Sequence, residues 1–148
     1  MKAILQRVSE ASVSVDQRVT GEIGVGLLVL LCAEPDDTEE TSERLIKKIL
    51  ALRIFPDEAN KMNLSLSQIQ GALLVVSQFT LAADTRRGNR PSFTGAASPE
   101  HAKYLYEDFI VRARRSGLTV ASGVFGANMQ VSLVNDGPVT IPINVSSP

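Results

Sequence analysis

The sequence is poor in the side chains that hold metals, since its 148 residues include one cysteine, one histidine and no tryptophan. The single cysteine, Cys32, excludes a disulfide within the chain and fits a reducing compartment, where it serves most simply as a small buried residue. With the lone His101 it is too little for the ligand clusters that bind zinc or iron, so we expect no metal site. His101 falls in the first turn of a predicted helix, which is more typical of a surface residue than of a catalytic base.

Strong charge of one sign and long apolar runs are also missing. The net charge is −1 and the pI about 5.8, so any polyanion has to be held by a local patch. The longest uncharged apolar stretch, Ile23 to Ala33, is too short to span a bilayer. There is no P-loop or GxGxxG pattern, and we expect no cofactor. The length fits one compact domain over residues 1–148, which we expect to be cytoplasmic and free of membranes.

What the sequence does contain is a regular series of strands and two helices. Residues 25–33 and 72–81 are apolar on both faces, as in central buried strands. Further strands are predicted at residues 4–15, 19–23, 53–55, 120–124, 129–134 and 139–145. Helix caps at Asp36 to Thr38 and at Ser98–Pro99 precede apolar stripes at helical spacing. The series predicts an α+β domain with mixed sheets covered by helices.

One turn signal contradicts itself. Asp136-Gly137 between two alternating apolar runs predicts a two-residue hairpin, because both residues tolerate a positive φ. The fourth residue of that turn should donate its N–H to Asn135, but it is Pro138, which has none. The local pattern gives no reason for a proline here.

The stretch Ser77-Gln78-Phe79-Thr80-Leu81 places two hydroxyls and an amide where a buried strand enters a long loop. Polar strand residues without a function are an equal alternative. A hydroxyl nucleophile needs an adjacent base, and none is evident. Backbone N–H groups that stabilise an oxyanion are the more plausible device. In a regular strand Gln78 and Thr80 share one face, so the four residues reach one atom only if the strand bends.

Arginines gather in two places. Arg86, Arg87 and Arg90 lie in the loop after this strand, where they could grip phosphates or belong to a solvated polar loop. Arg112, Arg114 and Arg115 lie at a predicted helix end, where the helix dipole already favours cations.

The opening MKAILQRVSEASVSV, the SQFTL stretch and the segment GVFGANMQVSLVNDGPVT, in this order, resemble the D-aminoacyl-tRNA deacylase (D-tyrosyl-tRNA deacylase) family from Met1 to Val145. The resemblance implies a homodimer that hydrolyses D-amino acids, and also glycine, from the 3′-terminal adenosine of tRNA. It further implies a barrel-like sandwich covered by two or three helices, in three layers (ββα).

The resemblance also implies the site. Ser77, Gln78, Phe79 and Thr80 would be catalytic, with either Thr80 or a ribose-activated water as nucleophile. The Gly137–Pro138 bond would be cis, and its two carbonyls would enter the partner's site, hold the substrate ammonium and exclude L-side chains. Arg7 would brace this dipeptide, with Asn135 beside it, and Phe125 and Met129 would line the adenine pocket, although Met129 serves equally as a core residue. A non-catalytic RNA-binding module and a general D-amino-acid esterase remain alternatives.

Overall fold

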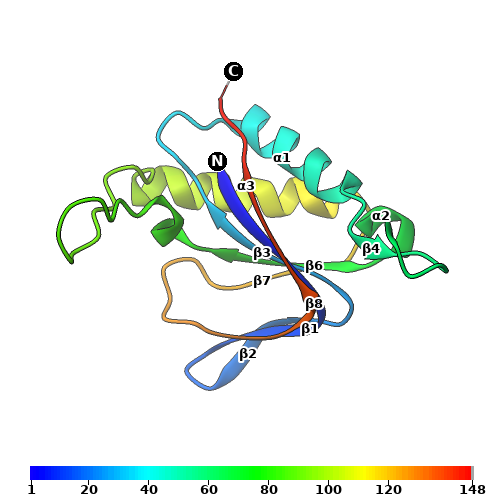
Figure 1. Cartoon of the computed structure of the whole chain (residues 1–148). Coiled ribbons are helices and arrows are strands. Elements are labelled where there is room, and N and C mark those ends of the chain that lie inside the picture. Colours follow the sequence, from blue (N-terminus) through cyan, green and yellow to red (C-terminus); the bar gives the residue numbers. More distant parts are fainter. Residues whose placement is uncertain (148) are drawn as a thin grey trace.

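A computed structural model of the chain describes residues 1–147 and is organised around one long strand (Figure 1). This strand, β1 (Lys2–Val15), pairs antiparallel along one edge with β3 (Gly26–Cys32) and then with β2 (Arg18–Ile23). Along its other edge it pairs antiparallel with β8 (Gln130–Asn144). Asp16 and Gln17, both at positive φ, form the tight turn from β1 to β2.

The sheet continues in parallel and almost closes on itself. Strand β6 (Ala72–Ser77) pairs with β3, and β7 (Val120–Ser122) pairs with β6, both in parallel. The far edges β2 and β7 approach so closely that a Cβ at Gly21 would lie 2.5 Å from the Ser122 carbonyl oxygen. A mixed sheet that bends until its outer strands meet is the barrel-like arrangement expected from the resemblance.

Helices α1 (Glu39–Ala51) and α3 (Pro99–Arg114) lie side by side on one face of this sheet (Figure 1). Alternate residues of β3 and β6 divide between two cores: Leu27 and Leu73 face the helices, whereas Leu28 and Leu74 face β8 and β2. Burial on both faces explains the unbroken apolar runs of these strands. The result is a helical layer, a central layer and a second β layer, which confirms the predicted α+β, three-layer fold.

The helix signals in the sequence are local, and the structure confirms them. Ser98 accepts a hydrogen bond from the His101 amide, Pro99 occupies the first turn of α3, and Gly117 follows that helix at a φ of +84°. Strand β4 (Phe55–Pro56) overlaps the strand predicted at residues 53–55 at Phe55 alone, whereas its partner β5 (Met62–Leu64) and a short helix α2 (Leu66–Ile69) were not predicted. The capping pair of Ser65 and Gln68 was the available signal for α2. Across residues 1–147, no helix has both the length and the apolar character to cross a membrane.

The hairpin predicted at Asp136–Gly137 is wrong. Residues 130–144 form one strand, β8, and its two halves pair in succession with the same neighbour, β1. The register passes directly from Val8–Asn135 to Gln6–Thr140. Residues 136–139 are therefore a bulge opposite β1, where a turn donor at position 138 is not needed.

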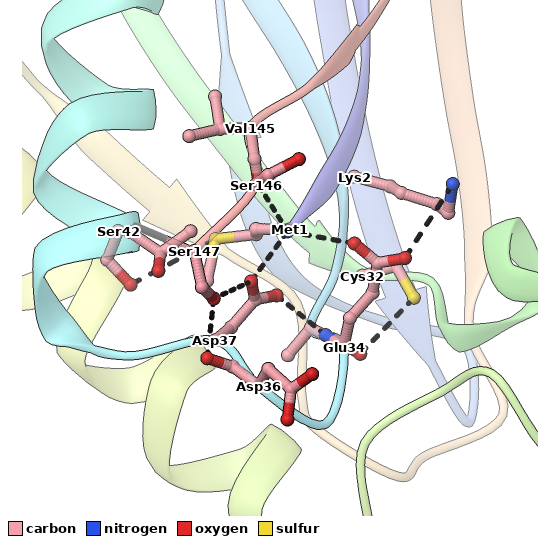
Figure 2. A network of polar contacts seen from close by, with 12 residues as sticks. Met1, Lys2, Cys32, Glu34, Asp36, Asp37, Ser42, Val145, Ser146 and Ser147 are labelled. Atoms are coloured by element: carbon pink, nitrogen blue, oxygen red, sulfur yellow. Dashed lines mark hydrogen bonds and ion pairs between the residues drawn. The ribbon is translucent and has the colours of Figure 1, made fainter.

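Met1 and residues 145–147 lie together beside the first turn of α1, in the polar network that Figure 2 shows. The ammonium of Met1 donates to Asp37 Oδ1 (2.8 Å), Glu34 Oε2 (3.0 Å) and the Val145 carbonyl oxygen (2.7 Å). Met1 and Asp37 are both buried. A charge taken out of water is stable only when it is paired and hydrogen-bonded, so these contacts fix β1 against the loop before α1.

Candidate active site

The predicted strand over residues 72–81 ends early, at Ser77. Gln78 has φ −142° and ψ 74°, and Phe79–Ala82 form a 3₁₀ turn, η1. The first hydrogen bonds of this turn run from the Leu81 amide to the Gln78 oxygen (3.2 Å) and from the Ala83 amide to the Thr80 oxygen (3.1 Å). The amides of Phe79 and Thr80 precede them and have no acceptor within the turn. Two adjacent N–H groups of this kind are suited to binding an oxyanion.

Neighbouring strands hold this bend in place. The Gln78 amide donates to the Leu31 carbonyl oxygen (2.8 Å), and the Cys32 thiol lies 3.6 Å from the Phe79 carbonyl oxygen. Burial raises the pKa of the Cys32 thiol, and the Glu34 carboxylate acts in the same direction. The thiol therefore stays protonated and serves as a hydrogen-bond donor. In this form it is not a nucleophile, because the nucleophilic form of cysteine is the thiolate. Above the turn, the Gln78 side-chain amide donates to the Thr80 hydroxyl.

A cavity of about 600 Å³ opens beside the bend. Ser77, Gln78, Phe79, Phe125 and Met129 are all among the residues that line it. Its surface is largely apolar, and its volume lies in the range of small-molecule sites. Met129 also packs against the core under β8. Its position is therefore compatible with both alternatives, a residue that lines the cavity and a residue of the core.

Phe93 is a wall residue that the sequence did not single out. Its ring meets that of Phe79 edge to face, with centroids 5.1 Å apart, although Phe79 is 54% exposed. Tyr106 supports the opposite wall: its ring lies 5.9 Å from that of Phe125, and its hydroxyl donates to the Val75 carbonyl oxygen (2.7 Å). An aromatic residue in the long loop after SQFTL was the only signal for Phe93.

The other predicted residues form a second group around the bulge of β8. Arg7 Nε donates to the Asp136 carbonyl oxygen (2.9 Å), and Arg7 Nη1 donates to the Ile54 carbonyl oxygen (2.8 Å). Asn135 Oδ1 accepts from the Val139 amide (3.0 Å), so the first N–H after Pro138 is satisfied by a side chain. The peptide bond between Gly137 and Pro138 is cis.

Within each group the predicted residues lie close together, but the two groups do not meet in one chain. Neither Gly137 nor Pro138 lines the cavity beside Ser77, and the same holds for Arg7 and Asn135. Gly137 and Pro138 are exposed, and the register of β8 leaves them outside the ladder with β1. Thr80 does not line the cavity itself, but its hydroxyl accepts a hydrogen bond from Gln78, which does.

Two other residues that the sequence analysis considered, His101 and Arg112, make contacts that join elements of the fold. His101 Nε2 lies 2.9 Å from the Asp37 carbonyl oxygen and ties α3 to the loop before α1, which is a structural contact. Arg112 bonds to Asp108 and Glu39 and joins α3 to α1. Within residues 1–147, no three His, Cys, Asp or Glu side chains gather in an arrangement that could hold a metal ion.

Comparisons with known proteins agree along the whole chain. The family model described as D-Tyr-tRNA(Tyr) deacylase matches residues 4–144. A D-aminoacyl-tRNA deacylase from Azoarcus sp. (strain BH72) is 59% identical, over 98% of this chain and 96% of its own. The corresponding protein from Variovorax paradoxus (strain S110) is 58% identical, over 99% of this chain and all of its own.

Two solved structures are similar in fold. One, named c-Myc DNA Unwinding Element Binding Protein, has a TM-score of 0.92 and 42% identity, with 99% of this chain and 100% of that chain covered. The other, described as a probable eukaryotic D-amino acid tRNA deacylase, has a TM-score of 0.87 at 18% identity, covering 96% and 97% of the two chains. At that identity the second supports the fold alone.

Proposed function

Because the chain belongs to the family described as D-Tyr-tRNA(Tyr) deacylase, we propose that it hydrolyses the ester bond of D-aminoacyl-tRNA. The products are the free D-amino acid and tRNA, and the enzyme is a carboxylic ester hydrolase. The family match over residues 4–144 carries this proposal, and the cavity lined by Gln78 and Phe79, at the start of the turn that contains Thr80, gives it a site. The cytoplasmic location expected from the sequence belongs to the same proposal.

In the proposed reaction the ester carbonyl oxygen accepts hydrogen bonds from the Phe79 and Thr80 amides. Water attacks the carbonyl carbon and gives up a proton, and the carbonyl oxygen takes up negative charge. The carbonyl then re-forms as the bond to the ribose oxygen breaks, and the ribose oxygen takes up the proton that the water released. Gln78 positions the ester, while Ser77 forms the cavity wall below it. The terminal adenine stacks between Phe125 and Met129, since single-stranded bases bind readily on aromatic rings.

Water, assisted by the neighbouring ribose hydroxyl, is the nucleophile rather than Thr80. A threonine hydroxyl attacks only when a base takes its proton. The Thr80 hydroxyl instead accepts a hydrogen bond from the Gln78 amide, which is not a base. In this scheme Thr80 positions the turn and contributes its backbone N–H.

Selection for the D-form comes from the second group of residues, around the bulge of β8, which a partner subunit supplies. Gly137 and Pro138 are exposed, unpaired with β1 and absent from the cavity of their own chain. In a homodimer the two carbonyls of one protomer enter the other's cavity and accept hydrogen bonds from the substrate ammonium. Arg7 and Asn135 hold the bulge in shape through their bonds to Asp136 and Val139.

This geometry rejects the L-form by exclusion. With the carbonyl and the ammonium both fixed, the hydrogen and side chain on the α-carbon have two remaining positions. The D-side chain points out of the cavity, whereas the L-side chain meets the carbonyls of Gly137 and Pro138. The enzyme therefore accepts many D-amino acids, and it also accepts glycine, which has no side chain to clash.

The deciding experiment compares D-Tyr-tRNA, L-Tyr-tRNA and Gly-tRNA as substrates. D-Tyr-tRNA is expected to react at least about a hundredfold faster than L-Tyr-tRNA, because a clash of about 3 kcal/mol in the transition state corresponds to that ratio. Thr80→Ala, Gln78→Ala and Pro138→Ala should each lower the rate, while Ser67→Ala, an exposed hydroxyl on α2, should not. Equal rates for the D- and L-substrates would defeat the proposal.

Two other functions are tested by the same assay. One solved relative is named for binding a DNA element, which favours a nucleic-acid-binding module without catalysis as the second candidate. In that case the protein retains tRNA or DNA on a filter but hydrolyses no ester, and the three variants have no activity to lose. A general D-amino-acid esterase would turn over free D-tyrosine esters as efficiently as charged tRNA.

A further inference from the structure

The loop between η1 and α3 has no role in the reaction proposed above. Residues 85–95 of this loop are all exposed. Two backbone hydrogen bonds close it at its base, from the Asp84 amide to the Ser92 oxygen (2.7 Å) and from the Ser92 amide to the Asp84 oxygen (2.9 Å). Its tip, residues 85–91, is therefore a closed lobe, which projects from the body of the protein in Figure 1.

The lobe carries three arginines, of which one is neutralised. Arg86 contacts Asp84 at two points, Nε to Oδ1 (2.9 Å) and Nη2 to Oδ2 (2.7 Å). These hydrogen bonds lower the pKa of the Asp84 carboxyl, so the pair persists below neutral pH. Asp84 is the only acid between Ala82 and Ser98. Arg87 and Arg90 enter no ion pair with any residue of the described part of the chain, and they present two positive charges on a protein whose net charge is −1.

The lobe lies at the rim of the cavity. Phe93, which lines the cavity and meets Phe79, comes three residues after Arg90. Three residues of extended chain span at most about 11 Å, so the backbone of Arg90 lies within that distance of the cavity wall. A nucleic-acid strand whose last base lies in the cavity has its preceding phosphates within reach of these arginines.

We propose that Arg87 and Arg90 bind phosphates of the nucleotides that precede the terminal adenosine of a bound tRNA. The inference rests on the proposed function. It states how the same site holds the tRNA strand that leads to the terminal adenosine. A guanidinium matches the oxygens of a phosphate at two points, which makes arginine the preferred side chain for this contact. Phosphate contacts fix the position of a strand without reading its sequence, which suits an enzyme that accepts many tRNAs.

The test measures kcat/KM for D-Tyr-tRNA and for 3′-O-D-tyrosyl-adenosine, which has no phosphate. In the double variant Arg87→Ala/Arg90→Ala, the ratio of the two values is expected to fall about tenfold, as two exposed ionic contacts of about 0.7 kcal/mol each would give. Because each phosphate contact on a single strand contributes about 0.7 to the slope of log affinity against log salt, the slope for tRNA should become shallower by about 1.4. The matched control is Lys47→Ala/Lys48→Ala, which removes the same charge from the exposed face of α1.

The outcomes separate this inference from the proposed function. If the unaltered protein hydrolyses neither substrate, the proposed function fails. If it hydrolyses both, but the double variant keeps the ratio and the salt slope, or the lysine control changes them equally, the arginine assignment fails alone. Duplex DNA that inhibits as strongly as uncharged tRNA, at equal nucleotide concentration, would overturn the assignment to the tRNA 3′ strand.

Discussion

Several single side chains in this structure make hydrogen bonds to backbone groups of the proposed site. Asn135 provides the acceptor for the Val139 amide, and Arg7 bridges Asp136 and Ile54, which are distant from it in the chain. The Cys32 thiol faces the Phe79 carbonyl oxygen from below. Each contact stabilises a backbone segment whose amides or carbonyls enter the proposed reaction, so the residue scale is where positioning is decided.

Asp37 is a buried, paired carboxylate whose loss should lower stability substantially. Its carboxylate accepts from the Met1 ammonium and, through Oδ2, from the Glu34 amide (2.7 Å). Asp37→Ala is expected to lower the free energy of unfolding by about 3 kcal/mol, because a buried charge loses its buried partner. Glu34→Gln removes a more exposed partner and should cost about 1 kcal/mol or less. Urea unfolding of both variants measures this difference, and equal losses would contradict it.

Tyr106 should make stability fall at alkaline pH. Burial raises its pKa to about 12. An unfolded tyrosine has a pKa near 10, so the folded state holds the proton more tightly. The stabilisation is complete below about pH 10 and is lost as pH rises toward the folded value. Tyr106→Phe should therefore have a flatter dependence of unfolding free energy on pH between 9 and 11. Parallel curves for the two proteins would contradict this reasoning.

At the scale of elements, close contact between backbones determines how the strands are joined. Gly26 begins β3 directly opposite Ala72, where β6 begins. A Cβ at Gly26 would lie 1.9 Å from the Ala72 carbonyl oxygen. The same kind of approach, between Gly21 and Ser122, brings β2 to β7. At both contacts the backbones lie closer than a side chain on the glycine would allow.

Two glycines test this view: Gly24 in the β2–β3 connection and Gly26 at the start of β3. Gly26→Ala should lower the free energy of unfolding by about 2–3 kcal/mol or more, because two backbones must separate to admit the methyl group. Gly24→Ala is the matched control, since nothing lies within 4 Å of the added Cβ. It should be neutral or slightly stabilising, because alanine restricts the unfolded chain. Thermal or urea unfolding compares the two, and similar values would show that the close approach is unimportant.

At the scale of the whole molecule, one chain does not assemble all the residues of the proposed site. The bend at Phe79 and the bulge at Gly137 belong to different surfaces, and the cavity beside the first contains no residue of the second. In the two-fold symmetric dimer that we propose, each protomer would place its bulge in the cavity of the other.

The dimer proposal predicts recovery of activity on mixing two inactive variants. Thr80→Ala and Gly137→Ala should each be nearly inactive alone. After dissociation and reassembly in equal amounts, about one quarter of the activity should return, since half the dimers are mixed and each has one intact site. Recovery is measured with D-Tyr-tRNA after dilution from mild urea. A protein that is monomeric by light scattering, or a mixture that stays inactive, would contradict shared sites.

Several elements of this protein could be predicted from its sequence because their signals are local. The doubly apolar runs predicted β3 and β6, and Ser98, Pro99 and Gly117 predicted the limits of α3, because caps and burial periodicity act over a few residues. The two site motifs were identified through their resemblance to a family rather than through local signals of this kind. A bend after Ser77 was the condition under which the four residues of SQFT could reach one atom, and the structure contains a bend there.

Contacts between distant segments depend instead on the tertiary structure. It made residues 130–144 one strand, because both halves found the same partner β1, and it thereby turned an expected hairpin into a bulge. It brought Arg7 to Asp136 and Phe93 to Phe79, and it brought the outer strands β2 and β7 close together at Gly21. Such contacts depend on the packing of whole layers, which no short stretch of sequence encodes, because the free energy that selects them is shared among many residues.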